Sequence, residues 1–153
     1  MPRFLVKFLS TFLYVGYFPL IPGTAGSLAG IFLFFLLKNN LSVYILILAA
    51  LLILGFWVSG RAEEIMSRKD PSCVVIDEVC GMLLGLLFVP YDIRLVVIGF
   101  LIFRILDTLK PSPIGKIEKL KGGLGIMGDD IIAGIYTNII LQVVARVAAF
   151  NGS

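Results

Sequence analysis

Acidic residues are scarce in this sequence, and half of them stand at the ends of strongly apolar segments. The 153-residue chain has 10 acidic and 13 basic residues, and nine of these lie in residues 103–130, between two apolar segments. The acidic residues at segment ends are Asp77, Glu78, Asp107, Asp129 and Asp130. Carboxylates are the ligands that hard cations such as Mg²⁺ or Mn²⁺ prefer. The pattern therefore predicts a metal site.

A simpler explanation exists for some of these acids. Aspartate and glutamate favour helix N-termini, where a cap contributes about 0.5–2 kcal/mol. Asp107 does not fit, because it is expected near a helix C-terminus, where the macrodipole disfavours an anion. An ion pair with Arg104, three residues earlier, is the structural alternative for Asp107. Five carboxylates exceed the need of one ion pair, so we favour the metal site.

A phosphate is the ligand that the neighbouring residues suit. Arg104 and Lys110 are the charged candidates to bind it, and a metal-polarised water could attack phosphorus. Asp129 or Asp130 is our candidate general base. The glycines of residues 122–125 could bring backbone N–H groups to an anion, or could form only a flexible connector. The hydroxyls of Thr24 and Ser27, in the loop 22–27, could line the site, or that loop could only turn the chain.

The residue types also exclude some chemistry. The chain has no histidine, which rules out imidazole as nucleophile, base or ligand. A cysteine-based phosphatase is disfavoured, because neither Cys73 nor Cys80 is followed by arginine at the sixth position. The D-x-D pair typical of aspartyl-phosphate enzymes is absent. We predict that both cysteines are reduced.

Composition indicates a membrane protein. The chain is 59% hydrophobic and 15% charged, with a mean hydropathy of +1.02. Soluble domains average about 45–50% apolar residues and about 25% charged residues. No charge occurs in residues 8–37, 39–60 or 131–145. Such runs approach the roughly 20 residues that a membrane-crossing helix needs. A cleaved signal peptide is the alternative at the N-terminus, but the run 16–26 lacks a small-residue cleavage pattern.

The predicted fold is all-α: a polytopic membrane helical bundle of about four to five hydrophobic helices plus an N-terminal interfacial helix, in one domain spanning residues 1–153. The short apolar segments could be re-entrant, and Pro19, Pro22 and two glycines predict a loop at 16–27, with Ser27 capping the next helix. The expected elements are an interfacial helix at 3–15 and apolar segments at 28–37, 41–59 with a polar helical extension, 79–89, 95–109 and 131–150.

An up-and-down order of these segments brings all three acidic clusters, Asp77-Glu78, Asp107 and Asp129-Asp130, to one side of the membrane. That side carries nine basic residues: Arg3, Lys7, Arg61, Arg68, Lys69, Lys110, Lys116, Lys119 and Lys121. The other side has three: Lys38, Arg94 and Arg146. By the positive-inside rule, the acidic side is expected to be cytoplasmic.

Four motifs in the same order resemble the phosphatidylglycerophosphatase A family. They are PGTAGSL at 22–28, IDEVCGM at 76–82, FRILDTLKPSPI at 103–114 and GGLGIMGDDIIAG at 122–134. The resemblance implies a multi-pass enzyme of the bacterial inner membrane that removes the terminal phosphate of phosphatidylglycerophosphate and depends on Mg²⁺. It assigns the five acids to metal binding and catalysis, and Arg104, Lys110, Thr24 and Ser27 to the phosphate. The expected partners are a phospholipid substrate and the membrane, with no nucleic acid.

Two other functions are compatible with the residues alone. A Mg²⁺-dependent lipid phosphotransferase also uses clustered aspartates, although this chain lacks closely spaced aspartate repeats. A small membrane transporter subunit is the second alternative. Transport sites usually lie near the middle of the membrane, whereas these acids are predicted at helix ends.

Overall fold

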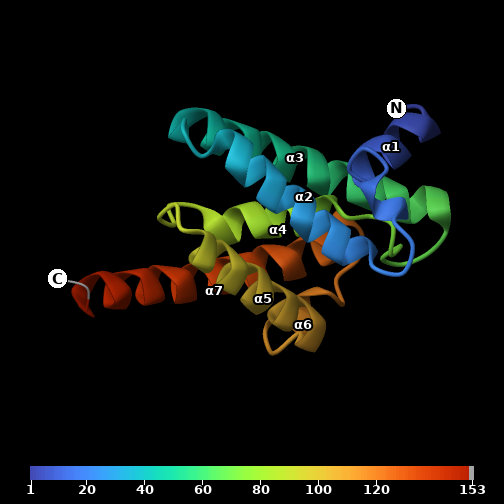
Figure 1. Ribbon diagram of the computed structural model, residues 1–153. Coiled ribbons are helices and arrows are strands. Elements are labelled where there is room, and N and C mark those ends of the chain that lie inside the picture. The colour runs from blue at the N-terminus through green and yellow to red at the C-terminus, as the bar shows by residue number, and fades with distance from the viewer. Residues whose placement is uncertain (152–153) are drawn as a thin grey trace.

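The structure is a computed structural model that describes the backbone of residues 1–151 and the side chains of residues 1–147. All regular structure in these residues is helical, which confirms the all-α prediction (Figure 1). The elements are α1 (Arg3–Ser10), the 3₁₀ turn η1 (Val15–Tyr17), α2 (Pro22–Leu37), α3 (Leu41–Met66), α4 (Ile76–Leu86), α5 (Ile93–Leu109), α6 (Ile114–Ile117) and α7 (Gly123–Asn151).

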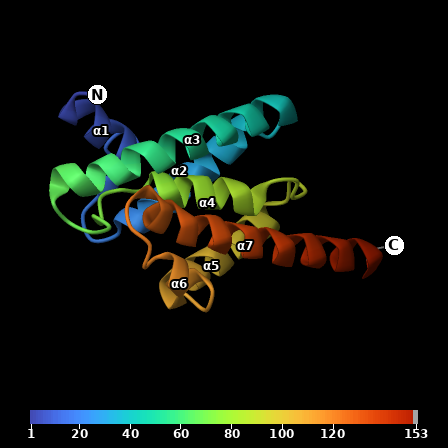
Figure 2. The ribbon, with the colours of Figure 1, turned by 180° about the vertical axis from the view of Figure 1, so that it is seen from behind.

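Helix α4 forms the centre of the molecule. Helices α2 and α3 lie on one side of it, and α5 and α7 lie on the other, as Figure 1 and the view from behind in Figure 2 show. Nine of its 11 residues are buried, including Asp77. A helix that is apolar on all its faces is expected inside a protein. The charged start of α4 therefore lies against the surrounding helices.

Two helices in the described part of the chain are long and apolar enough to cross a membrane. They are α3, with 26 residues, and the stretch Gly123–Val147 of α7, with 25. At 1.5 Å per residue these lengths are about 39 and 37 Å, against about 30 Å of hydrocarbon. In the most apolar stretch of each, under a third of the residues are buried, at 22% and 28%. Crossing by the other, shorter helices stays a prediction.

The predicted loop at 16–27 is only partly correct, because α2 begins at Pro22. Proline is well suited to the first helical turn, where its missing N–H has no partner to lose. Gly26 lies inside the helix, and a Cβ there would lie 2.9 Å from Cβ of Val75. Close packing against the start of α4 thus outweighs the low helix propensity of glycine. Ser27 is consequently inside a helix and is not its cap.

The N-terminal helix is shorter than predicted. It ends at Ser10 and not near residue 15, because Phe12, Leu13 and Tyr14 all have positive φ. Gly16 then packs so closely on the carbonyl of Cys73 that a Cβ would overlap it. The chain must fold back on itself to make this contact.

Helix α7 begins at Gly123, well before the predicted start at Ile131. Gly122, with φ +66°, makes the turn into the helix, and Gly123 packs against the backbone carbonyl of Phe56. The prediction that residues 122–125 form an irregular loop was therefore wrong for all but Gly122. Asp129 and Asp130 are the seventh and eighth residues of α7, about two turns into the helix, and do not precede it.

Helices α3 and α5 follow the sequence pattern closely, whereas α4 begins and ends three residues before the predicted segment 79–89, and the short helix α6 was not predicted. Helix α3 continues beyond the apolar segment to Met66, which confirms the polar helical extension. Helix α5 ends at Leu109, as predicted, and places Asp107 in its last turn. The turns between α2 and α3 and between α4 and α5 lie at one end of the bundle, whereas the loops before α2, α4 and α7 lie at the other (Figure 1). We call the second end the loop end.

Candidate metal and phosphate site

Three carboxylates from two helices meet at the loop end. Asp77 and Glu78 lie in the first turn of α4, and Asp130 lies on α7. One oxygen of each lies within 4.8 Å of the others. Asp77 and Asp130 are 5% and 3% exposed, so the group is largely closed to solvent. Residues far apart in the sequence thus form one acidic cluster, which we call the carboxylate cluster.

A close crossing of α4 and α7 brings the cluster together. A Cβ on Gly81 would lie 2.7 Å from the backbone oxygen of Asp130, and one on Gly134 would overlap the carbonyl of Gly81. Small residues at a crossing allow two helix backbones to approach closely. The two glycines therefore fix how near Asp130 can come to the start of α4.

The cluster is electrostatically unfavourable without a cation. An oxygen of each member is buried with no hydrogen-bond partner in the structure: Asp77 Oδ1, Glu78 Oε2 and Asp130 Oδ1. Burial, followed by the neighbouring charge of Glu78, raises the pKa of Asp77 well above its ordinary value. Burial raises the pKa of Glu78 to about 7, although a hydrogen bond with Asp77 opposes this shift. Unpartnered oxygen donors of this kind fit a hard divalent cation.

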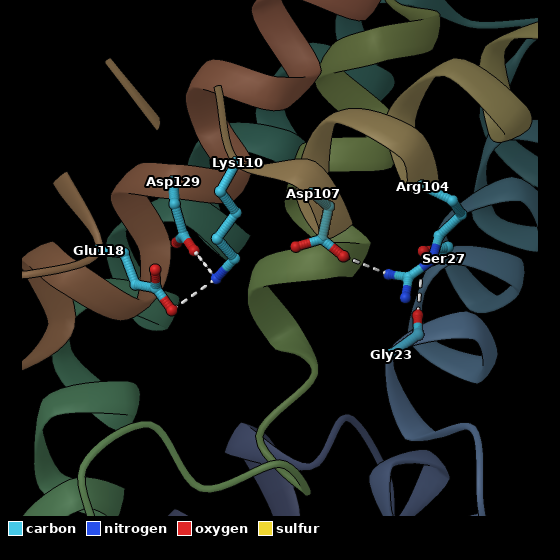
Figure 3. Close-up of polar contacts among 7 residues, drawn as sticks. All are labelled: Gly23, Ser27, Arg104, Asp107, Lys110, Glu118 and Asp129. Carbon is cyan, nitrogen blue, oxygen red and sulfur yellow. Dashed lines mark hydrogen bonds and ion pairs between the residues drawn. The ribbon is translucent and has the colours of Figure 1, made fainter. Parts of the chain in front are cut away.

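Asp107 lies beside the cluster and forms an ion pair. Its Oδ2 accepts a hydrogen bond from Arg104 Nη1 at 2.6 Å (Figure 3). Both side chains are mostly buried, with 15% and 24% exposed. The Asp107 charge also contributes to the raised pKa of Glu78. The ion pair that the sequence offered as the simpler alternative is thus present, and it borders the carboxylate cluster.

Asp129 is paired with Lys110 through Oδ2, and its Oδ1 is buried with no hydrogen-bond partner in the structure. Lys110 Nζ lies 2.8 Å from Asp129 Oδ2 and 2.8 Å from Glu118 Oε1 (Figure 3). Burial alone would lower the pKa of Lys110, but these two hydrogen bonds raise it above its usual range. Successive helix residues point about 100° apart, which separates the partners of the two aspartates. The predicted set of five acids is therefore divided into a cluster of three and two members of ion pairs.

The two predicted hydroxyl residues differ in their surroundings. Ser27 is fully buried, and its hydroxyl donates to the Gly23 carbonyl oxygen at 3.0 Å (Figure 3). That contact is within α2 and leaves the hydroxyl hydrogen occupied. Thr24 is half-buried and lines a cavity. Of the two, Thr24 is the one that a ligand could reach.

That cavity has a volume of about 370 Å³ and lies between the start of α2 and the loop before α4. It brings a carboxylate and a guanidinium to one space. A Cβ on Gly23 would lie 2.6 Å from Glu78 Oε1 and 3.2 Å from Arg104 Nη1, so a larger residue would displace the ends of these two side chains. The lining residues are Leu20, Ile21, Pro22, Gly23, Thr24, Asp70, Ser72, Val74, Glu78 and Arg104.

Sequence reasoning missed Asp70, which also lines this cavity. Burial raises the pKa of Asp70, the charge of Lys110 opposes that shift, and the charges of Glu118 and Asp107 add to it. Asp70 therefore lies within electrostatic reach of the Lys110 and Asp107 ion pairs. Asp70 lies in a loop on the side of the membrane where the acidic clusters were predicted. That position could have identified it as a candidate site residue.

These features define a class: an all-helical chain with two helices able to cross a membrane and a buried carboxylate cluster beside two ion-paired cations at one end. The chain belongs to the phosphatidylglycerophosphatase A family, whose model matches residues 8–145.

Three curated relatives are similar in sequence over most of their length. A Bacteroides thetaiotaomicron protein, provisionally named a phosphatidylinositol-3-phosphatase, is 39% identical over 153 residues, covering 93% of this chain and 94% of its own. Phosphatidylglycerophosphatase A of Escherichia coli K12 is 37% identical over 134 residues, covering 86% and 78%. Its Haemophilus influenzae counterpart is 37% identical over 124 residues, covering 78% and 76%. The comparison with solved structures found no match.

Proposed function

We propose that this chain is a lipid phosphatase that hydrolyses the terminal phosphate monoester of phosphatidylglycerophosphate. The products are phosphatidylglycerol and inorganic phosphate. The family and two of the relatives support the substrate. The observation that carries the chemistry is the carboxylate cluster, one member of which, Glu78, lines a cavity that Arg104 also lines. The length of the family match supports one domain over the chain.

Asp77, Glu78 and Asp130 are the proposed ligands of Mg²⁺, with Asp107 and Asp129 beside them. Their unpartnered oxygens supply hard donors, and the set contains no nitrogen or sulfur ligand. A bound Mg²⁺ would neutralise phosphate charge and make a water molecule more acidic. In this arrangement Asp107 contributes through its position next to Glu78, and Asp129 through its hold on Lys110.

Arg104 and Lys110 are the proposed phosphate-binding cations. Arg104 lines the cavity and uses Nη1 for Asp107, which leaves other N–H groups for phosphate oxygens. Lys110 is paired with Asp129 and Glu118 and does not line the cavity, so binding phosphate would require it to leave one of these partners. Thr24 adds a hydroxyl at the cavity wall, whereas the role of Ser27 is in the packing of α2.

The proposed reaction is direct hydrolysis. The water oxygen forms a bond to phosphorus, the bond from phosphorus to the glycerol oxygen breaks, and that oxygen takes up a proton from solvent. A carboxylate, Asp129 or Asp130, accepts the proton that the water loses. Arg104 balances the charge that gathers on the phosphoryl oxygens.

The proposed location is the bacterial inner membrane, with several crossings and the site facing the cytoplasm. Ten of the 13 basic residues, Arg104 included, belong to the segments of the loop end and three to the opposite side. Helix α7 is about 43 Å long at 1.5 Å per residue, so its first turns can extend past the hydrocarbon and hold Asp130 at the surface.

A phosphatidylinositol monophosphate is a second candidate substrate. The Bacteroides relative covers nearly all of this chain, and its name refers to that lipid. Both lipids present a phosphate monoester on a polyol headgroup, so the same carboxylates and cations would serve either one.

Phosphate release from the two lipids tests the proposal. Purified protein in detergent receives phosphatidylglycerophosphate or phosphatidylinositol 3-phosphate, with Mg²⁺ or with a chelator. We expect Mg²⁺-dependent release, faster with phosphatidylglycerophosphate, and a loss of at least 100-fold in Asp77→Asn. Asp92→Asn is the matched control, because Asp92 is an exposed helix cap that asparagine can replace. Release that is equal with and without Mg²⁺, or unchanged in Asp77→Asn, contradicts the assignment.

A further inference from the structure

An exposed apolar surface borders the candidate site. It lies in the segment between α1 and α2, where six large apolar or aromatic residues are exposed. Leu20 is the extreme case, with 99% of its surface accessible. The rings of Tyr14 and Tyr17 lie 5.9 Å apart, measured between centroids, so these two aromatic residues are neighbours on this surface. Large exposed apolar surface rimmed by polar residues marks contact with a protein, a membrane or a ligand. We call this surface the apolar rim: Leu13, Tyr14, Tyr17, Phe18, Leu20 and Ile21.

The backbone holds the apolar rim in place. Thr11 is fully buried, and its hydroxyl donates to the Lys7 carbonyl at 2.7 Å and accepts from the backbone N–H of Tyr14 at 3.2 Å. Gly16 is packed against the carbonyl of Cys73. The buried faces of this segment are thus fixed to its neighbours, and the apolar side chains are left outside.

The rim is continuous with the cavity. Leu20 and Ile21 belong to the rim and also line the cavity that contains Glu78 and Arg104. One wall of the cavity is therefore apolar and leads outward, and the other is charged. A molecule with a phosphate at one end and hydrocarbon next to it matches both walls.

The charges around the rim favour a lipid surface as its occupant. Arg3 and Lys7 are exposed on α1, and Phe8 of the same helix lies 5.4 Å from Tyr14 of the rim, measured between ring centroids. Cationic residues beside aromatic and aliphatic ones are typical of segments that lie in the interface of an anionic membrane. A protein partner would need a complementary apolar face, and nothing in the rim's charge pattern selects one.

We propose that the apolar rim inserts into the lipid surface next to the cavity and guides a phosphomonoester lipid into it, hydrocarbon along Leu20 and Ile21 and phosphate toward Arg104. The inference rests on the proposed phosphatase function and adds a selectivity: the rim favours lipids held in a bilayer over soluble phosphate esters.

The kinetic test compares two substrates of one protein reconstituted in nanodiscs. One is long-chain phosphatidylglycerophosphate in the bilayer, and the other is its water-soluble dibutanoyl form. Phe18→Ser alters the rim without altering the cavity lining. We expect it to lower kcat/KM about tenfold for the long-chain lipid, and less than twofold for the soluble form.

A matched control is available at the opposite end of the molecule. Phe88 is 62% exposed and Phe18 is 56% exposed, and Phe88 lies in the turn after α4. Phe88→Ser should leave both substrates unchanged. Equal losses on both substrates in Phe18→Ser, or no loss on either, overturn the proposal.

A second measurement does not depend on activity. The chain has one tryptophan, so Trp57→Phe combined with Leu20→Trp gives a single fluorescent probe in the rim. We expect brominated lipids to quench this probe and aqueous iodide to leave it unquenched. A probe at exposed Arg68, in the polar loop of the same end, should behave in the opposite way. Iodide quenching of the rim probe without lipid quenching overturns the proposal, even if the chain acts on another substrate.

Discussion

At the scale of single residues, two adjacent aspartates have different surroundings. Asp130 belongs to the carboxylate cluster, whereas Asp129 is 2.8 Å from Lys110. One aspartate is a proposed ligand of the cation, and the other positions a lysine. Substituting them should therefore change different measured properties. The ligand's loss affects metal affinity, and the positioning residue's loss affects mainly the rate.

We therefore expect Asp130→Asn and Asp129→Asn to differ in how they change phosphatase activity and the Mg²⁺ requirement. Asp130→Asn should lower phosphatase activity at least 100-fold and raise the Mg²⁺ concentration needed for half-maximal rate. Asp129→Asn should lower activity about 10–100-fold with little change in that concentration, because it releases Lys110 and leaves the cluster intact. A titration of activity with Mg²⁺ for both variants provides the measurement. The same Mg²⁺ requirement in both variants would argue against the division.

The raised pKa values of Asp77 and Glu78 predict how stability depends on pH without metal. The pKa of Glu78 is about 7 in the folded protein and about 4.5 ordinarily. The folded state therefore binds the proton more tightly, so this group's contribution to stability is full below about pH 4.5 and is lost as pH rises through about 7. Asp77 shifts in the same direction.

We expect the thermal midpoint of metal-free protein in detergent to fall by several degrees between pH 5.5 and 8, since each kcal/mol corresponds to about 2–4 °C in a chain of this size. Excess Mg²⁺ should remove most of this fall, because it stabilises the ionised carboxylates. Glu78→Gln should show a smaller fall. A midpoint that rises over this range in the metal-free protein would contradict the shifts.

At the scale of elements, the crossing of α4 and α7 determines the site. Gly81 and Gly99 offer a matched pair, because a Cβ on either would lie 2.7 Å from its nearest neighbour. For Gly81 that neighbour is the backbone oxygen of Asp130, with the Phe103 ring equally close. For Gly99 it is the end of the Leu141 side chain, which can move aside.

Gly81→Ala should therefore be harmful and Gly99→Ala nearly neutral. The first should destabilise the protein by about 1–3 kcal/mol and weaken Mg²⁺ binding, because α4 and α7 must move apart. The second should change stability by under about 1 kcal/mol, since alanine also has the better helix propensity. Thermal unfolding with and without Mg²⁺ measures both effects. Equal destabilisation in the two variants would show that backbone contact is not the limiting feature.

The sequence predicted these elements unevenly, for identifiable reasons. Apolar segments and Pro111 predicted α5 and its last turn with Asp107 correctly. The starts of α2 and α7 were misplaced, because glycine was taken as a helix breaker, whereas Gly26 and Gly123 serve close packing against other helices. Such contacts are tertiary, so local propensity cannot reveal them.

At the scale of the whole molecule, the sequence could predict which end of the bundle the acidic residues reach. It could not predict which acidic residue pairs with which basic residue. Alternating apolar segments predicted that Asp77, Asp107 and Asp129 reach the same end. Which acid faces a cation depends on the orientation of α7 about its axis, and the misplaced start of α7 hid that orientation. Asp70 was missed because a loop residue has no periodicity from which to infer its direction.

The central claim of this account is that the carboxylate cluster holds the divalent cation on which phosphate release depends. The most direct measurement is a titration with Mn²⁺ followed by electron paramagnetic resonance, at pH 8, in wild type, Asp77→Asn, Asp130→Asn and the control Asp92→Asn. We predict tight Mn²⁺ binding that Mg²⁺ displaces in wild type and Asp92→Asn, and binding weakened at least tenfold in the two cluster variants. Equal Mn²⁺ binding by all four proteins would contradict the claim.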